Sequence, residues 1–376
     1  MRIRINKWMG MFFLALVVIE MGDLKMAAQS RHDPLQVLGI SEDQIWNGIT
    51  VSDDGRIFVN FPAISPRPIQ AVGEIGADKR SHPYPGGDWN SWEPSKPVEH
   101  AFVGTNSVRI GPDGALWVVD TGSPSFGKEV LPNATKIVKI DLSTNTVSRV
   151  YPLGSDVVKS KSYIDDIRFH GETAYLTDAG VPGILVLDLT TGKVRRVLDH
   201  DPSTTGTRVI KVNGEVLLGP DGKPLMQHAD QMEVTPDGQW LYFQPLAGPM
   251  SRIATRWLDD PGIQPGELST KVEPWFNTGS LGGTAIDSNG DLYLEDLNTS
   301  SILKLTPDRK LSIVFHDARL HWVDAPWIQD GWLYLPEAQL DRAAQFHQQQ
   351  SKVQWPLHLY RLRLAALPNA QPHHAQ

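Results

Sequence analysis

Asn and Asp residues recur at one corresponding position in six similar segments of the sequence. Aligning these segments places five of them in register, with glycine at the remaining position: Asn47, Asn106, Asp165, Asp230, Gly282 and Asp324. Carboxylate and amide oxygens are the ligands that a hard divalent cation such as Ca²⁺ prefers. The five residues are therefore predicted ligands of a polar small molecule or of Ca²⁺ or another divalent cation. The alternative is structural, because Asn and Asp also cap strands by bonding to nearby backbone.

Further polar residues stand close to this set. Asp166, Gln231 and Glu233 lie beside it on the same segments, and His228 and His321 lie on the preceding loops. We expect all five to contribute to ligand binding at the same place. If a metal-bound water were the nucleophile, His228 or Glu233 would be the predicted general base. The chain has neither a GxSxG motif nor an HExxH motif, so nothing favours a serine nucleophile or a zinc-protease site.

Each of the six segments is typical of a β-hairpin. Apolar and polar residues alternate, an Asp-Gly, Asn-Gly or His-Gly turn follows, and a second strand rich in aromatic residues comes after it. The segments are NGITVSDDGRIFV (47–59), NSVRIGPDGALWV (106–118), DDIRFHGETAYL (165–176), DQMEVTPDGQWLYF (230–243), GGTAIDSNGDLYL (282–294) and DAPWIQDGWLYL (324–335). The aromatic residues of the second strands are predicted to pack between neighbouring units.

Further strands follow several hairpins, so each repeat contains about four antiparallel strands. One such unit cannot bury its own apolar faces, and stacking the units around an axis solves this problem. The sequence therefore predicts an all-β fold, a single six-bladed β-propeller over residues 31–368. The stretch before Trp46 is expected to close the ring by pairing with the last blade, and 356–364 is expected to be an outer strand. The six aligned polar positions would then surround one mouth of the central channel.

Several segments are similar to those of the Yellow / major royal jelly protein family. They occur in the family's order and cover nearly the whole chain from about residue 46 to residue 340. The segments are HPYPGGDWNSW (82–92), LWVVDTG (116–122), KIVKIDLSTNTVSRVYPL (136–153), LTDAGVPGILVLDLTTGKVRRVLDH (176–200) and MEVTPDGQWLYFQPLAG (232–248). The resemblance also implies a six-bladed propeller. It implies no catalytic residue, because this family has no shared catalytic motif that the chain matches.

Two functions follow as expectations. Some insect relatives bind small ligands such as biogenic amines, and others are linked to pigment chemistry or serve as secreted nutrients, so the resemblance implies a binding protein. The aligned ring is also similar in outline to the metal sites of regucalcin/gluconolactonase and paraoxonase propellers, which implies a metal-dependent lactone or ester hydrolase. Against the hydrolase, Gly282 and Gly283 stand where the fifth blade would need an acid, and Asn47 stands where a glutamate would be expected. The binding protein is preferred.

Composition narrows the class of protein. The chain has 376 residues, a formal net charge of −8 and no cysteine. An acidic chain lacks the basic footprint of a nucleic-acid-binding protein, and without cysteine there are no disulfides. The predicted partner is a small molecule. A protein partner on the propeller rim is compatible with everything in the sequence.

The first thirty residues have the layout of a secretory signal peptide. Basic residues precede an apolar run over 9–19, and small residues follow at Ala27, Ala28 and Ser30. The run is too short to span a bilayer as a helix. We therefore expect cleavage of 1–30, no membrane attachment afterwards, an extracellular or periplasmic location, and a disordered tail at 369–376. The alternative is that 1–30 stays attached as an N-terminal anchor. The Trp- and Pro-rich segment 82–94 is predicted to form a loop over the channel mouth.

Overall fold

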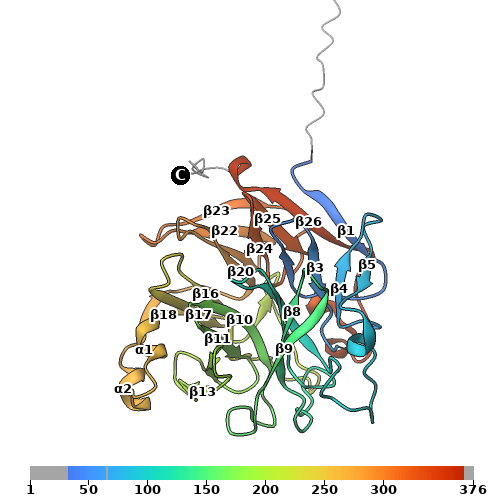
Figure 1. Ribbon diagram of the computed structural model, residues 1–376. Helices are drawn as coiled ribbons and strands as arrows, with labels where there is room; N and C mark the ends of the chain where they lie inside the picture. The colour runs from blue at the N-terminus through green and yellow to red at the C-terminus, as the bar shows by residue number, and fades with distance from the viewer. Residues whose placement is uncertain (1–32, 65–66, 368–376) are drawn as a thin grey trace, which may run out of the picture. The chain divides into compact units, whose positions relative to one another are not determined.

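The computed structural model describes residues 33–64 and 67–367. The predicted signal peptide 1–30 and the tail 369–376 lie outside the described residues. The main chain forms six antiparallel sheets of four strands each, and Figure 1 shows them around a common centre, with β10, β16, β20 and β24 on the inside. The predicted six-bladed β-propeller is confirmed. In the described part of the chain, no helix is both long enough and apolar enough to cross a membrane.

The first three blades follow one another in sequence. Blade one contains β2 Ile49–Val51, β3 Ile57–Asn60, β4 Val72–Ile75 and β5 Ser81–Pro83. Blade two contains β6 Thr105–Ile110, β7 Leu116–Asp120, β8 Lys136–Asp141 and β9 Thr146–Pro152. Blade three contains β10 Ile164–His170, β11 Thr173–Asp178, β12 Gly183–Asp188 and β13 Val194–Val197. A separate hairpin, β14 Lys211–Val212 and β15 Glu215–Val216, lies in the connection to blade four.

The last three blades complete the ring. Blade four contains β16 Ala229–Val234, β17 Trp240–Pro245, β18 Met250–Ala254 and β19 Glu273–Phe276, with the short helices α1 Thr255–Asp259 and α2 Pro265–Ser269. Blade five contains β20 Leu281–Ile286, β21 Leu292–Asp296, β22 Ser301–Leu305 and β23 Leu311–His316. Blade six contains β24 Trp327–Gln329, β25 Trp332–Pro336, β26 Leu357–Arg363 and β1 Gln36–Ser41. The 3₁₀ turns are η1 Gly87–Asn90, η2 Leu340–Arg342, η3 Ala344–Phe346 and η4 Leu364–Ala366.

The first strand of the chain closes the propeller. β1 pairs antiparallel with β26, so the outermost strand of blade six comes from the beginning of the chain. The expected closure by the stretch before Trp46 is confirmed, and β26 lies one position further in than the outer strand we predicted. The inner strands contact one another in a closed cycle, because β24 of blade six touches β2 of blade one. Six strands therefore surround one channel.

Local sequence explains these blades. The hairpin turns carry glycine in the left-handed region, with φ of 71° at Gly114 for example, where a side chain would be strained. The second-strand aromatic residues pack between blades as predicted. Trp117 of blade two is buried, and its ring centroid lies 5.1 Å from that of Phe169 in blade three. Apolar contacts of this kind hold neighbouring blades together in a chain that has no cysteine.

Candidate functional site

Four of the inner strands carry an irregularity at the aligned position. The pairing register shifts between Thr105 and Ser107 in β6, and corresponding shifts occur near the start of β10, β16 and β20. Such β-bulges leave a residue unpaired and redirect side chains. The predicted residues of these strands lie within the bulges, and this places adjacent polar residues such as Asp165 and Asp166 at the channel.

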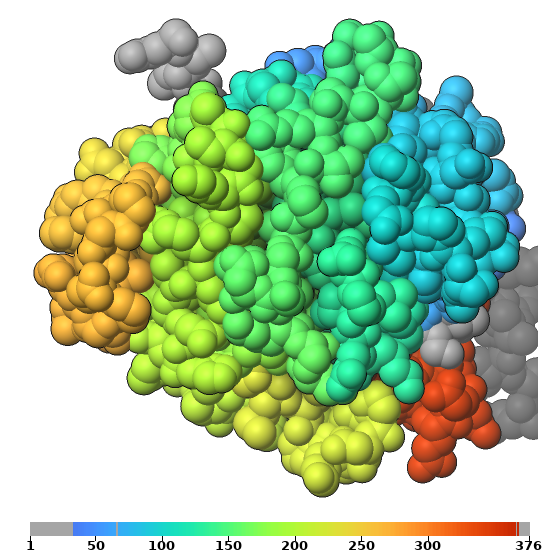
Figure 2. All heavy atoms as spheres, turned by 60° about the horizontal axis from the view of Figure 1, so that its bottom comes forward, coloured from blue at the N-terminus to red at the C-terminus, as the bar shows by residue number. Residues whose placement is uncertain are grey.

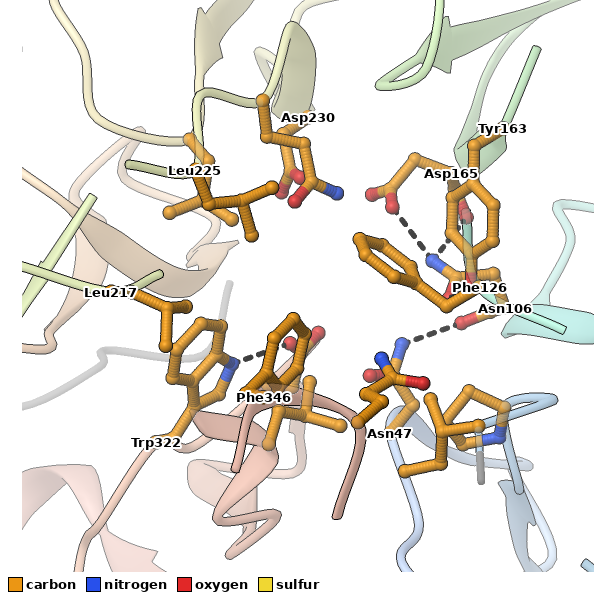
Figure 3. A pocket seen from close by; sticks show the side chains of 17 residues that line it. Asn47, Asn106, Phe126, Tyr163, Asp165, Leu217, Leu225, Asp230, Trp322 and Phe346 are labelled. Carbon is orange, nitrogen blue, oxygen red and sulfur yellow. Dashed lines mark hydrogen bonds between the residues drawn. The ribbon is translucent and has the colours of Figure 1, made fainter. Parts of the chain in front are cut away.

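All five aligned polar residues line one pocket. Asn47, Asn106, Asp165, Asp230 and Asp324 surround its floor, and Figure 3 shows four of them around a common space. A small polar cavity beneath the floor is lined by the same five residues, together with Asp166, Gln231 and the backbone of blade five. We call the larger space the mouth pocket. The sequence alignment therefore brought together residues from five different blades.

Hydrogen bonds link part of this floor into a chain. Asn47 Nδ2 donates to the carbonyl of Asn106 at 2.8 Å, and Asn106 Nδ2 donates to Asp165 Oδ1 at 2.7 Å. The Tyr163 hydroxyl donates to Asn106 Oδ1 at 2.8 Å. The two asparagines thus join neighbouring blades, so structural capping accounts for part of their role. Both amide N–H groups of Asn106 are used on Asp165, whereas Asn47 uses one of its two on Asn106.

Capping does not account for Asp230. The residue is only 7% exposed, and no described residue donates a hydrogen bond to its carboxyl group. The neighbouring Gln231 donates through Nε2 to the carbonyl of Leu281, whereas its buried Oε1 has no partner in the described chain. Asp324 accepts one hydrogen bond, from Trp322 Nε1 at 3.0 Å. The floor consequently presents acceptors in excess of donors.

Burial and mutual repulsion change the acidity of these carboxyl groups. Burial raises the pKa of Asp165 and of Asp230 well above the ordinary value, and neighbouring carboxylates add to both shifts. Burial likewise raises the pKa of Asp324 to about 7. Three carboxyl groups facing one space cannot all ionise without cost. A positively charged group placed among them would lower all three pKa values.

The walls of the mouth pocket are apolar and come from loops. Phe126, Leu217, Leu225, Trp322, Leu340 and Phe346 are among the lining residues. The segment around residue 220 (yellow) lies beside that around residue 345 (red-orange) in Figure 2, and both contribute to this pocket. The space between the walls is about 520 Å³, part of it open to solvent. One signal for this wall was available, because the aromatic residues Tyr163 and Trp322 each stand two residues before a floor aspartate.

Two of the predicted ligands belong to an ion network instead. Arg109 donates to Asp166 through Nη2 at 2.6 Å, and Arg168 binds Asp166 at 2.7 Å. Arg168 also holds Glu233 with two hydrogen bonds of 2.8 and 2.9 Å. Although burial opposes it, the two guanidinium groups lower the pKa of Asp166. Asp166 and Glu233 are each paired with guanidinium groups, so Glu233 is not available as a general base.

This network involves all six blades. Arg109 Nη1 donates to carbonyls before the inner strand of blade six, including Pro326 at 3.0 Å, and to Ile49 of blade one at 3.4 Å. Thr284 of blade five donates to Glu233 of blade four at 3.0 Å. Asp166 and Thr284 face the cavity under the mouth pocket, whereas Arg109, Arg168 and Glu233 line a second pocket at the other ends of the strands. The network thus separates the two ends of the channel.

Both predicted histidines lie outside the residues that line the mouth pocket. His228 accepts a hydrogen bond from the backbone of Gly206 at 3.1 Å, and burial lowers its pKa. His321 is buried and its Nε2 lies 2.8 Å from Asp341. Each histidine is thus held by a partner away from the floor, although the loops that carry them reach the pocket.

Close packing explains the glycines of blade five. A Cβ on Gly282 would lie 2.3 Å from the carbonyl oxygen of Val323, and a Cβ on Gly283 would lie 2.5 Å from the backbone nitrogen of Ala325. Blade six approaches too closely for any side chain here. The fifth blade therefore cannot place an acid at this position.

The segment 82–94 is not where we predicted it. None of its residues lines the mouth pocket. It leaves the outer strand of blade one, and Trp92 is buried in a cluster with Val103 and Ala134. The segment is a loop after β5, as predicted, but the predicted position over the channel mouth was wrong because Trp92 packs beside blade two.

The metal prediction requires converging ligands. Among residues 33–64 and 67–367, no group of three or more His, Asp or Glu side chains is arranged to hold a metal ion. The floor carboxylates therefore share a pocket without forming such a cluster.

Comparison with known proteins identifies the family. The sequence matches the profile described as "Major royal jelly protein" over residues 103–319, which is more than half of the chain. The chain belongs to the major royal jelly protein family. The matched region contains blades two to five and three of the floor residues, namely Asn106, Asp165 and Asp230.

This family member is similar in fold to several solved structures. One is the gluconolactonase XC5397 from Xanthomonas campestris, with a TM-score of 0.53 and 11% identity, covering 89% of each chain. A streptogramin B lyase has a TM-score of 0.51 and 13% identity, covering 89% of this chain and 97% of that one. Regucalcin from Agrobacterium tumefaciens has a TM-score of 0.50 and 13% identity, covering 87% and 93%. At these identities the likeness concerns the fold alone. No curated protein matches the sequence significantly.

Proposed function

We propose that this major royal jelly protein family member is an exported binding protein that holds a small polar, aromatic molecule in the mouth pocket. The observation that carries the proposal is Asp230, a buried residue that lines the pocket and whose carboxyl group receives no hydrogen bond from the described chain. Ionising a buried carboxyl group that has no donor is costly, and this cost raises the pKa of Asp230. A ligand that brings a donor would remove this cost.

The charge of the pocket favours a cationic ligand. Three aspartates surround the floor, and the described residues lining the pocket include no Lys, Arg or His. A protonated amine would donate hydrogen bonds to Asp230 and its neighbours and would stabilise their ionised forms. An aromatic ring on the same molecule would contact Phe126, Trp322 and Phe346. Aromatic rings attract one another in offset-stacked or edge-to-face arrangements. The proposed ligand class is therefore an aromatic amine cation.

Export rests on the order of basic, apolar and small residues in 1–30. We place the mature protein outside the cytoplasm, extracellular or periplasmic, with neither nucleic acid nor membrane as partner. Fractionation of cells that express the full chain should find the processed protein outside the cytoplasm. Removing 1–30 should retain it inside, and secretion without those residues would contradict this part of the proposal.

The alternative, a metal-dependent lactone or ester hydrolase, has less support. The two candidate bases are committed elsewhere, since Glu233 is paired with Arg168 and His228 lies outside the pocket lining. Close packing at Gly282 leaves no room for an acidic side chain from blade five in the ring of polar residues. The same experiment nevertheless tests both functions.

That experiment is thermal unfolding of the mature protein with EDTA, with Ca²⁺, Mg²⁺, Mn²⁺ or Zn²⁺, and with benzylamine as an aromatic amine probe. A ligand at about a hundred times its Kd stabilises the folded state by about 2.7 kcal/mol, a shift of several degrees at this chain length. We expect benzylamine to raise the unfolding temperature of the wild-type protein, and we expect this increase to be lost in Asp230→Asn. A shift with Ca²⁺ alone, lost in the same variant, would favour the hydrolase. No shift with benzylamine would contradict the proposal.

A further inference from the structure

The other end of the channel holds a second pocket, which we call the opposite pocket. Arg109, Arg168 and Glu233 form its floor, and side chains near the ends of the inner strands form its walls. The wall includes one half-buried apolar residue from each of five blades: Ile110, Phe169, Val234, Ile286 and Ile328. Its space is about 890 Å³, larger than that of the mouth pocket counted in the same way.

The acceptors at this floor are all occupied. Arg168 and Thr284 donate to Glu233, and both Asp166 oxygens receive guanidinium hydrogen bonds. The two arginines balance the two acids in charge. No acceptor of this network is left for a ligand.

Two donors remain. A guanidinium has five N–H groups. Arg168 uses three of them in hydrogen bonds, two to Glu233 and one to the carbonyl of Ile167, and Nη1 also forms the ion pair with Asp166. The fifth, on Nη2, has no acceptor in the described chain. Trp327 lines the same pocket, and its buried Nε1 also lacks a partner among the described residues. An unpaired buried donor is unfavourable, so a ligand with an acceptor would be stabilised here.

We propose that the opposite pocket is a second binding site, for a small aromatic molecule that carries a hydrogen-bond acceptor, of which an aromatic carboxylate is the simplest case. The apolar ring packs against Phe169, Ile286 and Trp327. The acceptor faces Arg168 and the Trp327 indole. This site is independent of the mouth pocket, because the ion network lies between them.

The test is calorimetric titration of benzoate into the mature protein. Benzoate should bind in a saturable manner. Trp327→Phe keeps an aromatic ring but removes the N–H, and one hydrogen bond to a charged group corresponds to a loss of affinity of about tenfold to a hundredfold. Ile286→Glu supplies an acceptor from the protein itself and repels the anion, so benzoate binding should be lost.

Matched variants control this result. Ile313→Glu makes the same change on the outer strand β23 of the same blade, where Ile313 is 64% exposed, and should leave benzoate binding unchanged. Asp230→Asn should also leave it unchanged, since it alters the other pocket. Circular dichroism shows that each variant is folded. Absence of benzoate binding to the folded wild-type protein, or equal binding by Ile286→Glu, would overturn the proposal. The outcome with benzylamine at the mouth pocket is a separate result.

Discussion

The two ends of the channel are built from the same six inner strands but differ in their hydrogen-bonding groups. At the mouth pocket, Asp230 offers an acceptor without a donor, and Gln231 does so in the small cavity beneath it. At the opposite pocket, Arg168 and Trp327 offer donors without acceptors. The difference follows from the strands. Where they are bulged, consecutive polar residues reach the channel; where they are regular, alternation places apolar residues such as Val234 and Ile286 at the rim.

The separation of the two ends depends on Arg109, whose loss should have the largest effect. Arg109→Met leaves the buried Asp166 carboxylate and several carbonyls without their donor. Removing one partner of a buried ion pair costs about 3–5 kcal/mol, which denaturant unfolding would measure. The matched change Arg80→Gln removes an exposed pair with Glu42 and should cost less than about 1 kcal/mol. Equal effects of the two variants would show that the network does not hold the blades together.

The mouth pocket should make stability depend on pH through Asp324. Its pKa is about 7 in the folded protein and lower in the unfolded chain. The folded state therefore retains the proton longer, and its stability falls as pH rises from about 4 to about 7. The Asp324→Asn variant lacks this loss. Its free energy of unfolding should equal that of wild type near pH 4 and exceed it above pH 7, by at most about 4 kcal/mol. A difference between the two proteins that does not change with pH would contradict the assignment.

The affinity for an amine ligand should also depend on pH through the ionisation of Asp324, with a smaller change in free energy. An amine cation binds the ionised form of Asp324, and at a pKa of about 7 the ionised fraction falls about tenfold between about pH 8 and about pH 6. Benzylamine affinity should fall by the same factor. Benzoate affinity at the opposite pocket should not follow this profile. A parallel pH profile for both probes would mean that the two pockets are not independent.

Much of the fold was predictable because hairpin turns and alternation are local. The period of the turn glycines indicates six blades, and the residues aligned from it share one pocket. The roles of Asp166 and Glu233 were not predictable, because their partners Arg109 and Arg168 come from other strands in a register set by blade packing. The consecutive polar pairs at 165–166 and 230–231 break the alternation, and this was the available signal for the bulges.

The loop walls had no comparable signal. Phe126 and Phe346 lie in insertions without periodicity, and only the folded chain places them beside each other, with ring centroids 5.8 Å apart. The Trp-rich segment 82–94 shows the opposite error. Its composition favours binding, but its position next to blade two buries Trp92.

The most direct test of the central claim is calorimetric titration of benzylamine into the wild-type protein and Asp230→Asn, at about pH 8 where Asp324 is ionised. A hydrogen bond to a charged group is worth about 1.5–3 kcal/mol, or about tenfold to a hundredfold in affinity. We predict saturable binding to wild type, weakened by that factor in the variant. Binding of equal strength to the two proteins, or none to wild type, would contradict a ligand site at the mouth pocket.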